Sequence, residues 1–350
     1  MVQNRALVFS AVPDGLPVAG KHMQVQATEF DDAAQPPAGG FTAKTIYASL
    51  DPYLRLRLVA PDKPRPGFEP LPAGSIIPNT VIARIIKSDN AALPPNTVVI
   101  GMAPIQEYIS VTGEQAFQFS PLQNPANVDL KLFLGPLGMP GLAAYAGLYE
   151  VAKPRTGETI FVSGASGAVG QLVGQIAKQA GLRVIGAAGS DEKVRLLTDV
   201  FKFDGAFNHR DGDARAHLER LAPGGIDIYY DNVGGELLDV AIDAMKPLGR
   251  IVACGQSSQY NALPSQQYGI RNTWQMPGKR ITWRGMNIFD DGLGDKYRAV
   301  HQEKVGQWIS DGTMQAVFSE TKSIEEAPAG LADLFAGKNV GKAVIHFGEQ

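Results

Sequence analysis

Residues 161–181, FVSGASGAVGQLVGQIAKQAG, decide the fold of this chain. The stretch begins with the apolar end of a short strand and turns through the small residues GASGAVG. It continues as a helix with Gly181 just beyond its end, and its apolar positions have helical spacing: Leu172, Val173, Ile176 and Ala177. A strand, a glycine-rich turn and a helix in this order predict a site for the phosphates of a nucleotide. The alternative is a small-residue corner of the kind found in any α/β protein.

The same alternation continues along the chain. Predicted strands lie in ETIFVSG, LRVIGAAG, GAFNH, IDIYYDNVG and GRIVACG, and predicted helices follow them near residues 170–180, 190–201, 213–221 and 236–245. Ser190 is expected to be the N-cap of the second helix. Repeated strand–helix pairs predict the α/β class, with a doubly wound parallel sheet covered on both faces. We therefore assign residues 137–303 to a Rossmann dinucleotide-binding domain.

The two ends of the chain lack this regular alternation of strands and helices. Residues 1–136 are rich in Pro and Gly and contain short apolar runs, a pattern typical of an irregular β-rich domain with many turns. Residues 61–74 are a loop by composition, and their length suggests a flexible segment or a lid. Residues 304–350 predict helix, strand, helix and strand. We expect this tail to rejoin the β-rich domain formed by residues 1–136.

The composition of the chain argues against several classes of protein. The 350 residues carry a net charge of −3 without a long basic run, which argues against a nucleic-acid partner. No window has about 18 uninterrupted apolar residues, and the N-terminus is a poor signal peptide, so we expect neither a membrane span nor secretion. The single cysteine, Cys254, excludes an intrachain disulfide and favours the cytoplasm. The five histidines show no paired spacing, so no metal site is expected.

The glycine turn differs from the strict dinucleotide fingerprint G-x-G-x-x-G. The comparable positions are Ala165, Gly167 and Gly170, with Gly164 just ahead. Gly167 is expected to let the backbone approach a pyrophosphate, and Gly170 to let the helix pack on the strand. Because a strand precedes the turn and a helix follows it, the nucleotide interpretation is favoured.

The end of the second predicted strand indicates which dinucleotide binds. A site for NAD places Asp or Glu there, whereas this chain has Gly189, followed by Ser190 and Lys193. A hydroxyl and a cation suit the 2′-phosphate of NADP. The alternative is that Lys193 is an ordinary solvated lysine, paired with Asp191 or Glu192.

Several segments in their order resemble one protein family. GMPGLAAYAGLYEVAKPRTGETIFVSGASGAVG, GSDEKVRLL, YYDNVGG, CGQSSQYN and GKNVGKAVI are similar to the medium-chain dehydrogenase/reductase superfamily, and DPYLRLRL resembles the DPYMR motif of its zinc-free branch of prostaglandin, plant double-bond and 2-alkenal reductases. The resemblance implies a Rossmann domain inserted into a GroES-like β-rich domain. It implies NADPH-dependent reduction of the C=C bond of α,β-unsaturated ketones or aldehydes. It also implies a homodimer, for which the strand around KRITWRGM is a candidate contact.

The resemblance carries cofactor-binding roles onto particular residues. They are Met139, Ala165, Ser166, Gly167, Ala168, Val169, Gly189, Ser190, Lys193, His209, Asn232, Cys254, Gly255, Ser257, Tyr260, Phe289 and Asn339. Two positions depart from the family pattern: His209 replaces a tyrosine, and Ala143 replaces a threonine whose hydroxyl contacts the cofactor. Cys254 is expected to be a small buried residue and not a nucleophile, because no histidine partner is evident.

Two tyrosines are catalytic candidates. Conjugate reduction needs a donor for the negative charge that develops on the carbonyl oxygen, and a phenol with a pKa of about 10 stays protonated at neutral pH. The resemblance places Tyr260 near the nicotinamide ribose, where it acts in catalysis or only positions the cofactor. Tyr53 lines the substrate pocket or belongs to the core of the β-rich domain.

Met286, Ile288 and Phe289 would exclude water from the hydride path or form plain strand core. A quinone oxidoreductase of the same superfamily and a non-catalytic NADPH-binding protein are the alternative functions.

Overall fold

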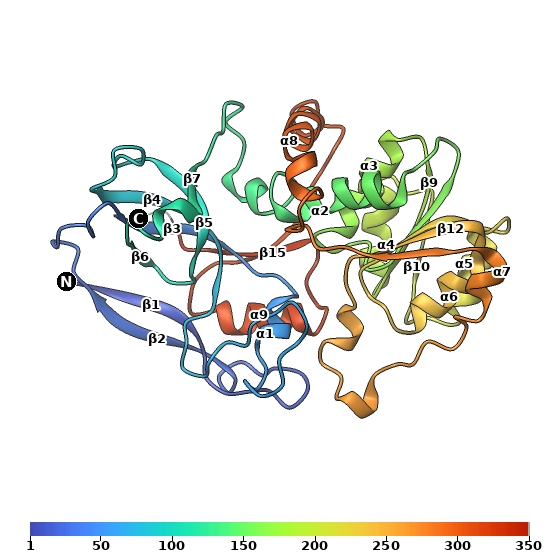
Figure 1. The fold of residues 1–350 in the computed structure, drawn as a ribbon, viewed down its shortest axis with the longest axis horizontal. Coiled ribbons are helices and arrows are strands. Elements are labelled where there is room, and N and C mark those ends of the chain that lie inside the picture. Colours follow the sequence, from blue (N-terminus) through green and yellow to red (C-terminus); the bar gives the residue numbers. More distant parts are fainter. Residues whose placement is uncertain (349–350) are drawn as a thin grey trace. The chain divides into compact units, whose positions relative to one another are not determined.

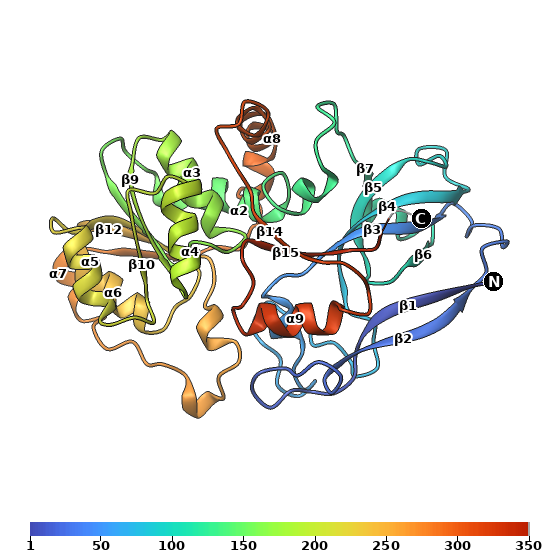
Figure 2. The same cartoon turned by 180° about the vertical axis from the view of Figure 1, so that it is seen from behind.

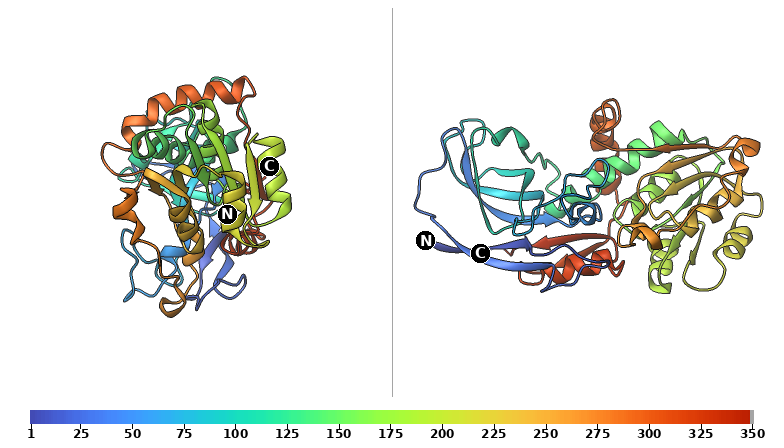
Figure 3. Two further views of the ribbon diagram at one scale, coloured as in Figure 1. Left: turned by 90° about the vertical axis from the view of Figure 1, so that its right-hand side faces the viewer. Right: turned by 60° about the horizontal axis from the view of Figure 1, so that its bottom comes forward.

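The structure is a computed structural model that describes residues 1–348. It divides into two compact units. The first unit contains Met1–Leu134, Phe318–Asn339 and the residues from Ala343 onward, and the second contains Gly135–Val317 and Val340–Lys342. Both the start of the chain and its last strand therefore belong to the first unit (Figure 3).

The second unit is built on a six-stranded sheet in which all neighbouring strands are parallel. Its strands are β8 (Thr159–Val162), β9 (Arg183–Ala188), β10 (Gly205–Asn208), β11 (Ile226–Asp231), β12 (Met245–Ala253) and β13 (Thr282–Gly285). The order is β10-β9-β8-β11-β12-β13, so strand addition reverses direction between β8 and β11. Ligands of such sheets bind outside the carboxyl ends of the strands at this reversal.

Helices cover both faces of this sheet, as the alternating pattern predicts (Figure 1). α3 (Gly170–Gln179), α4 (Asp191–Arg195) and the π-helical turn η4 (Leu196–Val200) lie on one face, where Leu197 and Phe203 approach Gly186 of β9. α5 (Ala214–Leu221) and α6 (Glu236–Ala244) lie on the other, where Leu218 and Leu238 share a core with Phe161 and Tyr229. Residues that alternate along a strand point to opposite faces, which is why each strand contributes to both cores.

The second unit begins and ends differently from the prediction. Its first helices are α2 (Met139–Ala146) and the π-helical segment η3 (Gly147–Ala152), and α8 (Gly294–Ser310) packs on α2. We expected a boundary between residues 303 and 304, but that position lies inside α8 and the unit continues to Val317. The physical reason is that α8 is bonded to the start of the unit: His301 Nε2 lies 2.8 Å from the Pro136 carbonyl oxygen, and Gln302 Nε2 donates to the Leu137 carbonyl at 2.6 Å.

The remaining short elements of the second unit follow β12. They are η5 (Ser257–Gln259), η6 (Pro264–Gln266) and α7 (Gln275–Lys279).

The first unit is β-rich. It contains a sheet with strand order β14-β15-β3-β4-β5-β7, in which β6 also pairs with β3, and a separate antiparallel pair, β1–β2. The strands are β1 (Val2–Phe9), β2 (Met23–Phe30), β3 (Phe41–Ser49), β4 (Pro78–Ser88), β5 (Val98–Pro104), β6 (Tyr108–Val111), β7 (Phe119–Pro121), β14 (Phe318–Thr321) and β15 (Lys342–His346). The short helices are α1 (Leu54–Arg57), η1 (Ala116–Gln118) and η2 (Leu130–Leu134).

The tail of the chain rejoins this unit, as predicted. β15 pairs antiparallel with β3, with Val344 opposite Ser49, and α9 (Ala327–Phe335) packs beside β2 (Figure 2). Ile324, Leu331 and Ile345 from the tail enter the same core as Leu7 and Val81 from the first part of the chain. The segment 61–74 has neither helix nor strand, as its composition indicates.

Candidate functional site

The turn after β8 is tightly constrained. Gly164 has a φ of +55°, a conformation that favours glycine, and its carbonyl accepts from the Gly167 amide at 2.9 Å. A Cβ on Gly170 would lie 2.4 Å from that same carbonyl oxygen, so α3 can start only with glycine there. Gly170 thus packs against the turn itself. A second glycine of α3, Gly174, packs against the ring of Phe203.

Two backbone hydrogen bonds to distant segments hold the turn in place. The Ala165 amide donates to the Ala187 carbonyl of β9 at 3.0 Å, and the Gly341 amide donates to the Ser166 carbonyl at 2.9 Å, where Gly341 pairs with Gly167. Ala165 is fully buried, and a Cβ on Gly186 would lie 3.0 Å from its methyl group. Alanine therefore fits at the first position of the fingerprint, and the turn keeps its place at the carboxyl end of β8.

Three basic side chains gather beyond the ends of β9 and β10. A Cβ on Gly189 would lie 3.4 Å from both Arg210 Nε and His209 Cε1. Ser190 caps α4 as predicted, its Oγ accepting from the Lys193 amide at 3.4 Å. Lys193 is only 9% exposed, and its burial, together with nearby Arg210, lowers its pKa. A lysine so buried is not on a solvated helix face. Asp191, in the same helix, accepts from Asn208 Nδ2 at 3.0 Å.

Of the two neighbouring residues His209 and Arg210, only His209 was predicted from the sequence to belong to the site. The His209 amide donates to the Ala188 carbonyl at 3.0 Å, while its ring Nδ1 is buried without a hydrogen-bond partner among the described residues. Burial and the Arg210 charge lower the pKa of His209. Arg210 was not among our predicted site residues. A second basic residue directly after His209 was the only signal, and it is indistinguishable from a solvated loop arginine until β9 and β10 are placed side by side.

The carboxyl end of β11 holds a buried carboxylate that the sequence analysis also missed. Asp231 is fully buried, and its Oδ1 accepts from the Tyr229 hydroxyl at 2.8 Å and the Ser163 hydroxyl at 3.2 Å. The same oxygen accepts from the amides of Val233 at 3.0 Å and Gly234 at 2.8 Å. Burial raises the pKa of Asp231, and Oδ2 has no hydrogen-bond partner among the described residues. Asp231 thus joins the turn after β8 to the turn after β11.

The predicted residues Asn232, Cys254, Gly255 and Ser257 are held by backbone carbonyls at the ends of β8 and β11. Asn232 Nδ2 donates to the Ser163 carbonyl at 2.8 Å, and the Asn232 carbonyl accepts from the Ser257 hydroxyl at 3.0 Å. The amides of Cys254 and Gly255 both donate to the Asp231 carbonyl, at 2.9 and 3.0 Å. Burial raises the pKa of the Cys254 thiol to about 11, which keeps it protonated and agrees with a non-nucleophilic role.

Tyr260 is folded back onto the loop that follows β12. Its hydroxyl oxygen accepts from the Gln256 amide at 3.2 Å, and a Cβ on Gly255 would lie 3.2 Å from the same oxygen. Burial raises the pKa of Tyr260. The phenol therefore stays protonated at neutral pH, and because it accepts in its contact with Gln256, its own proton is available for donation. The oxygen lies next to the end of β12, which neighbours β11.

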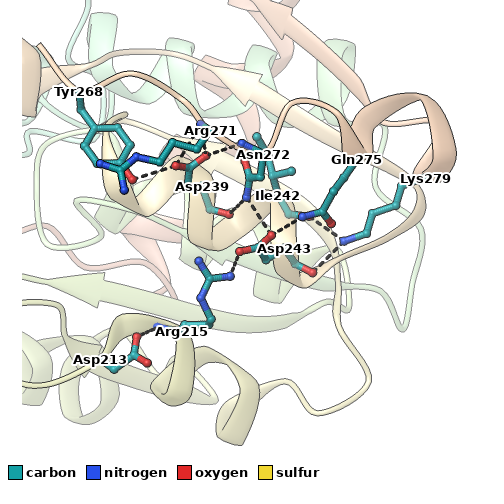
Figure 4. Close-up of polar contacts among 10 residues, drawn as sticks. All are labelled: Asp213, Arg215, Asp239, Ile242, Asp243, Tyr268, Arg271, Asn272, Gln275 and Lys279. Carbon is teal, nitrogen blue, oxygen red and sulfur yellow. Dashed lines mark hydrogen bonds and ion pairs between the residues drawn. The ribbon is translucent and has the colours of Figure 1, made fainter.

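Two aspartates of α6 anchor the far end of the Tyr260 loop (Figure 4). Asp239 Oδ2 accepts from the Tyr268 hydroxyl at 2.8 Å and Oδ1 from the Arg271 amide at 3.1 Å, while Asn272 Nδ2 donates to Asp243 at 2.9 Å. The Tyr268 amide in turn donates to the Gln259 side chain at 2.7 Å, next to Tyr260. This network ties the far end of the loop to α6 and links it to Gln259 beside Tyr260.

An apolar cluster in the second unit collects several predicted residues. Met139, Val169 and Met286 pack against the buried side chains of Ala143 and Ile288. The Ala143 carbonyl accepts from the Tyr230 hydroxyl at 2.9 Å. Phe289 is not part of this cluster, and its side chain is 75% exposed, so the described contacts do not bring it to the other site residues.

Two predicted site residues lie in the first unit. Tyr53 donates its hydroxyl to Asn79 Oδ1 at 2.6 Å, stacks on Phe68 and packs against the core, and burial raises its pKa. These contacts agree with the core interpretation of Tyr53, and its contact with substrate stays a prediction. Asn339 is half-buried in the first unit, two residues before Gly341 along the chain, and its cofactor contact also stays a prediction.

The edge of the sheet fits a dinucleotide that carries an additional phosphate. Lys193, Arg210 and the unpartnered His209 Nδ1 offer cations and an unused polar atom where an anion would bind. Residues 165–169 would hold the pyrophosphate, and Asn232 with the loop from Cys254 to Tyr260 would border the nicotinamide half. Among residues 1–348, no three His, Cys, Asp or Glu side chains are grouped so that they could hold a metal ion. Within the same residues, no helix has both the length and the apolar character needed to cross a membrane.

Comparison with known proteins agrees with this geometry. Residues 5–119 match the family model described as the N-terminal domain of oxidoreductase, and residues 168–301 match the one described as zinc-binding dehydrogenase. The chain is 43% identical to an NADP-dependent oxidoreductase of Cochliobolus heterostrophus over 100% of this chain and 99% of that protein. It is 39% identical to an NADP-dependent 2-alkenal reductase of Nicotiana tabacum over 98% and 97%.

A solved structure supports the same assignment. CurA of Vibrio vulnificus, crystallised in complex with NADPH, is 30% identical and superposes with a TM-score of 0.86 over 99% of this chain and 100% of that one. The chain therefore belongs to the NADP-dependent oxidoreductases of the medium-chain dehydrogenase/reductase superfamily, in the zinc-independent branch that contains the 2-alkenal reductases.

Proposed function

We propose that this enzyme reduces the C=C bond of α,β-unsaturated ketones or aldehydes with NADPH. The observation that carries the proposal is the protonated phenol of Tyr260, held by the Gln256 amide at the end of β12 with its own proton available. The similarity to a 2-alkenal reductase supports the same substrate class. When bound, NADPH supplies the hydride, and the protein supplies binding, orientation and electrostatic stabilisation.

Each group of residues has a separate task in this reaction. The turn 165–169, Ser190 and Lys193 bind the phosphates, and Asn232 and Ser257 orient the nicotinamide half. Met286 and Ile288 exclude water from the reacting carbons. Tyr260 donates a hydrogen bond to the substrate oxygen, directly or through a ribose hydroxyl, as negative charge develops there. Neither a strong base nor a nucleophile is required, which is consistent with the high pKa of the Cys254 thiol.

Substrate turnover tests the proposal. The purified enzyme is mixed with NADPH and a panel of simple enones, enals and quinones, and the decrease in NADPH absorbance is followed. We expect kcat/KM to be highest for an enone or enal, with the saturated carbonyl compound as product. Preference for quinones would assign the alternative reductase function, and binding of NADPH without turnover of any class would identify a non-catalytic NADPH-binding protein.

We further propose that the enzyme is a homodimer formed through β13. This strand is the edge of the parallel sheet, and all four of its residues, Thr282–Gly285, are exposed. An edge strand with unpaired backbone groups readily pairs with a second copy, and Trp283 would bury apolar surface on pairing. Light scattering should give twice the chain mass, and Trp283→Asp should lower it towards one chain. An unchanged mass in that variant would place the contact elsewhere.

We also propose that the enzyme acts in the cytoplasm. A single cysteine cannot form an intrachain disulfide, and a half-buried free thiol suits a reducing compartment. Fluorescent tagging of the intact chain in cells, with a fractionation assay for the untagged protein, tests this assignment.

A further inference from the structure

His209 occupies an unusual position for a histidine. Its backbone is fixed by the bond from its amide to the Ala188 carbonyl, and its ring Cε1 lies against Gly189 at the end of β9. Its buried Nδ1 has no hydrogen-bond partner among the described residues. The ring thus lies at the place assigned to the cofactor 2′-phosphate and carries a buried polar atom without a partner, and the proposal rests on that assigned site.

The charges around His209 favour its neutral form in the free protein. Arg210 follows it directly in the chain and Lys193 belongs to α4, and the charges of both disfavour a positive charge on the ring. The nearby carboxylates belong to the first turn of α4: Asp191 accepts a hydrogen bond from Asn208, and the charge of Glu192 acts on Lys193. Burial adds to the effect of the two cations, so the pKa of His209 is below its usual value.

A bound phosphate dianion would reverse this balance, because it places two negative charges among the cations. An opposite charge within a few ångströms favours the charged form of a titratable group. We propose that His209 determines specificity for the 2′-phosphate by taking up a proton when NADPH binds, so that its contribution to NADPH affinity grows as the pH falls from about 8 to about 6. In NADH the 2′-phosphate is absent, and His209 stays neutral.

The 2′-phosphate itself also titrates in this range, with a second pKa of about 6, and its protonation weakens binding at the acidic end. Wild-type affinity alone therefore does not isolate the histidine. The informative quantity is the ratio of Kd for a His209 variant to Kd for the wild type at each pH, because the phosphate titration is common to both and cancels.

Two substitutions separate charge from ring contact. His209→Gln keeps a polar side chain but cannot carry a charge, and His209→Tyr keeps an aromatic ring that stays neutral near pH 7. NADPH and NADH affinities are measured by titration calorimetry at pH 6, 7 and 8, in two buffers of different ionisation enthalpy. Adenosine 2′,5′-bisphosphate and 5′-AMP serve as matched probes that lack the nicotinamide, so binding is assessed independently of reductase activity.

We expect both variants to lose NADPH affinity by about twofold at pH 8 and about tenfold at pH 6, the scale of one charge-assisted hydrogen bond. Their NADH and 5′-AMP affinities should follow the wild type. Proton uptake on binding NADPH or the bisphosphate, seen as a difference between the two buffers, should be present in the wild type and smaller in both variants.

Three results would overturn the proposal. A Kd ratio that is constant between pH 6 and 8 would exclude the titration. Full NADPH affinity in His209→Tyr at every pH would assign His209 to ring contact alone. A wild-type His209 resonance, identified by its loss in His209→Gln, that shows no rise in pKa on adding the bisphosphate would exclude proton uptake without relying on the stability of either variant. If Lys193→Ala also leaves NADPH binding unchanged, the cofactor site itself is misplaced, which is a separate failure.

Discussion

The two ends of the candidate site are built on different principles. Beyond β9 and β10, the cations Lys193 and Arg210 lie near the ring of His209, whose buried Nδ1 has no hydrogen-bond partner among the described residues. Beyond β11 and β12, the buried Asp231 has one oxygen that accepts four hydrogen bonds from its own unit. We expect the first end to bind the cofactor phosphate, whereas the hydrogen bonds of the second end hold neighbouring loops together. Substitutions at the first should change affinity, and at the second stability or turnover.

The strongest test of this comparison is removal of the Asp231 carboxylate. Asp231→Ala leaves the hydroxyls of Tyr229 and Ser163 and the amides of Val233 and Gly234 without their acceptor. We expect the free energy of unfolding to fall by about 3–5 kcal/mol, because several buried donors lose a partner at once. Denaturant unfolding followed by circular dichroism measures the change.

Asp231→Asn is the matched control, since an amide oxygen can still accept the same bonds and Asp231 Oδ2 has no partner to lose. Its loss should be well under half that of the alanine variant. Burial raises the pKa of Asp231, so folding favours the protonated form. Stability from this group is present below the unfolded pKa of about 4 and is lost as the pH rises through the folded pKa. As the pH rises from the unfolded to the folded pKa of Asp231, the wild type should therefore lose free energy of unfolding relative to Asp231→Asn, which has no titrating group there. Equal pH profiles of stability for the two proteins would argue against a raised pKa of Asp231.

The next largest effect should come from Tyr260. Tyr260→Phe keeps the ring and removes the hydroxyl that accepts from the Gln256 amide. A direct donor to the developing oxyanion is worth about 2.7–4 kcal/mol, and one acting through a ribose hydroxyl less, so the loss should fall mainly on kcat. Single-turnover hydride transfer to a simple enone at saturating NADPH measures it.

Tyr260→Ala separates the two roles of this residue. If Tyr260 only positions the cofactor through its ring, the phenylalanine variant should keep nearly full kcat and only the alanine variant should be impaired. An unchanged single-turnover rate in Tyr260→Phe would remove this residue from the catalytic group and leave positioning as the main contribution of the β11–β12 end.

The smallest of the three effects belongs to the charged end. Lys193→Ala should weaken NADPH binding by about 1.5–3 kcal/mol, the scale of a charge-assisted bond to the 2′-phosphate, with NADH binding nearly unchanged. Fluorescence titration of both cofactors measures the difference. Lys178→Ala, which removes the same charge from the last turn of α3 and breaks a pair with Asp204, is the control and should alter neither affinity. Equal affinity of the wild type for NADPH and NADH would contradict the assignment.

Much of this architecture could be predicted from local patterns. The alternation of strands and helices and the N-cap Ser190 follow from short-range periodicity and turn residues, and the structure confirms them. The return of the tail to the β-rich unit was expected because a final strand often returns to an earlier sheet, and β15 does pair with β3. The boundary near residue 303 was misplaced because α8 belongs to the second unit through His301 and Gln302, which contact residues more than 160 positions earlier. No local pattern reports a contact of that kind.

The sequence by itself determined the glycine turn, the absence of an acidic residue at Gly189 and the presence of a phenol at Tyr260, since each depends on residue type at a position within one strand–turn–helix segment. Tertiary structure alone decided that Arg210 acts on Lys193, and that Asp231 accepts a hydrogen bond from Ser163, a residue 68 positions away. The physical reason is the strand order β10-β9-β8-β11-β12-β13, which brings distant turns to one edge of the sheet. The charge and burial of each residue at that edge depend on residues from the other turns, and these are distant from it in the sequence.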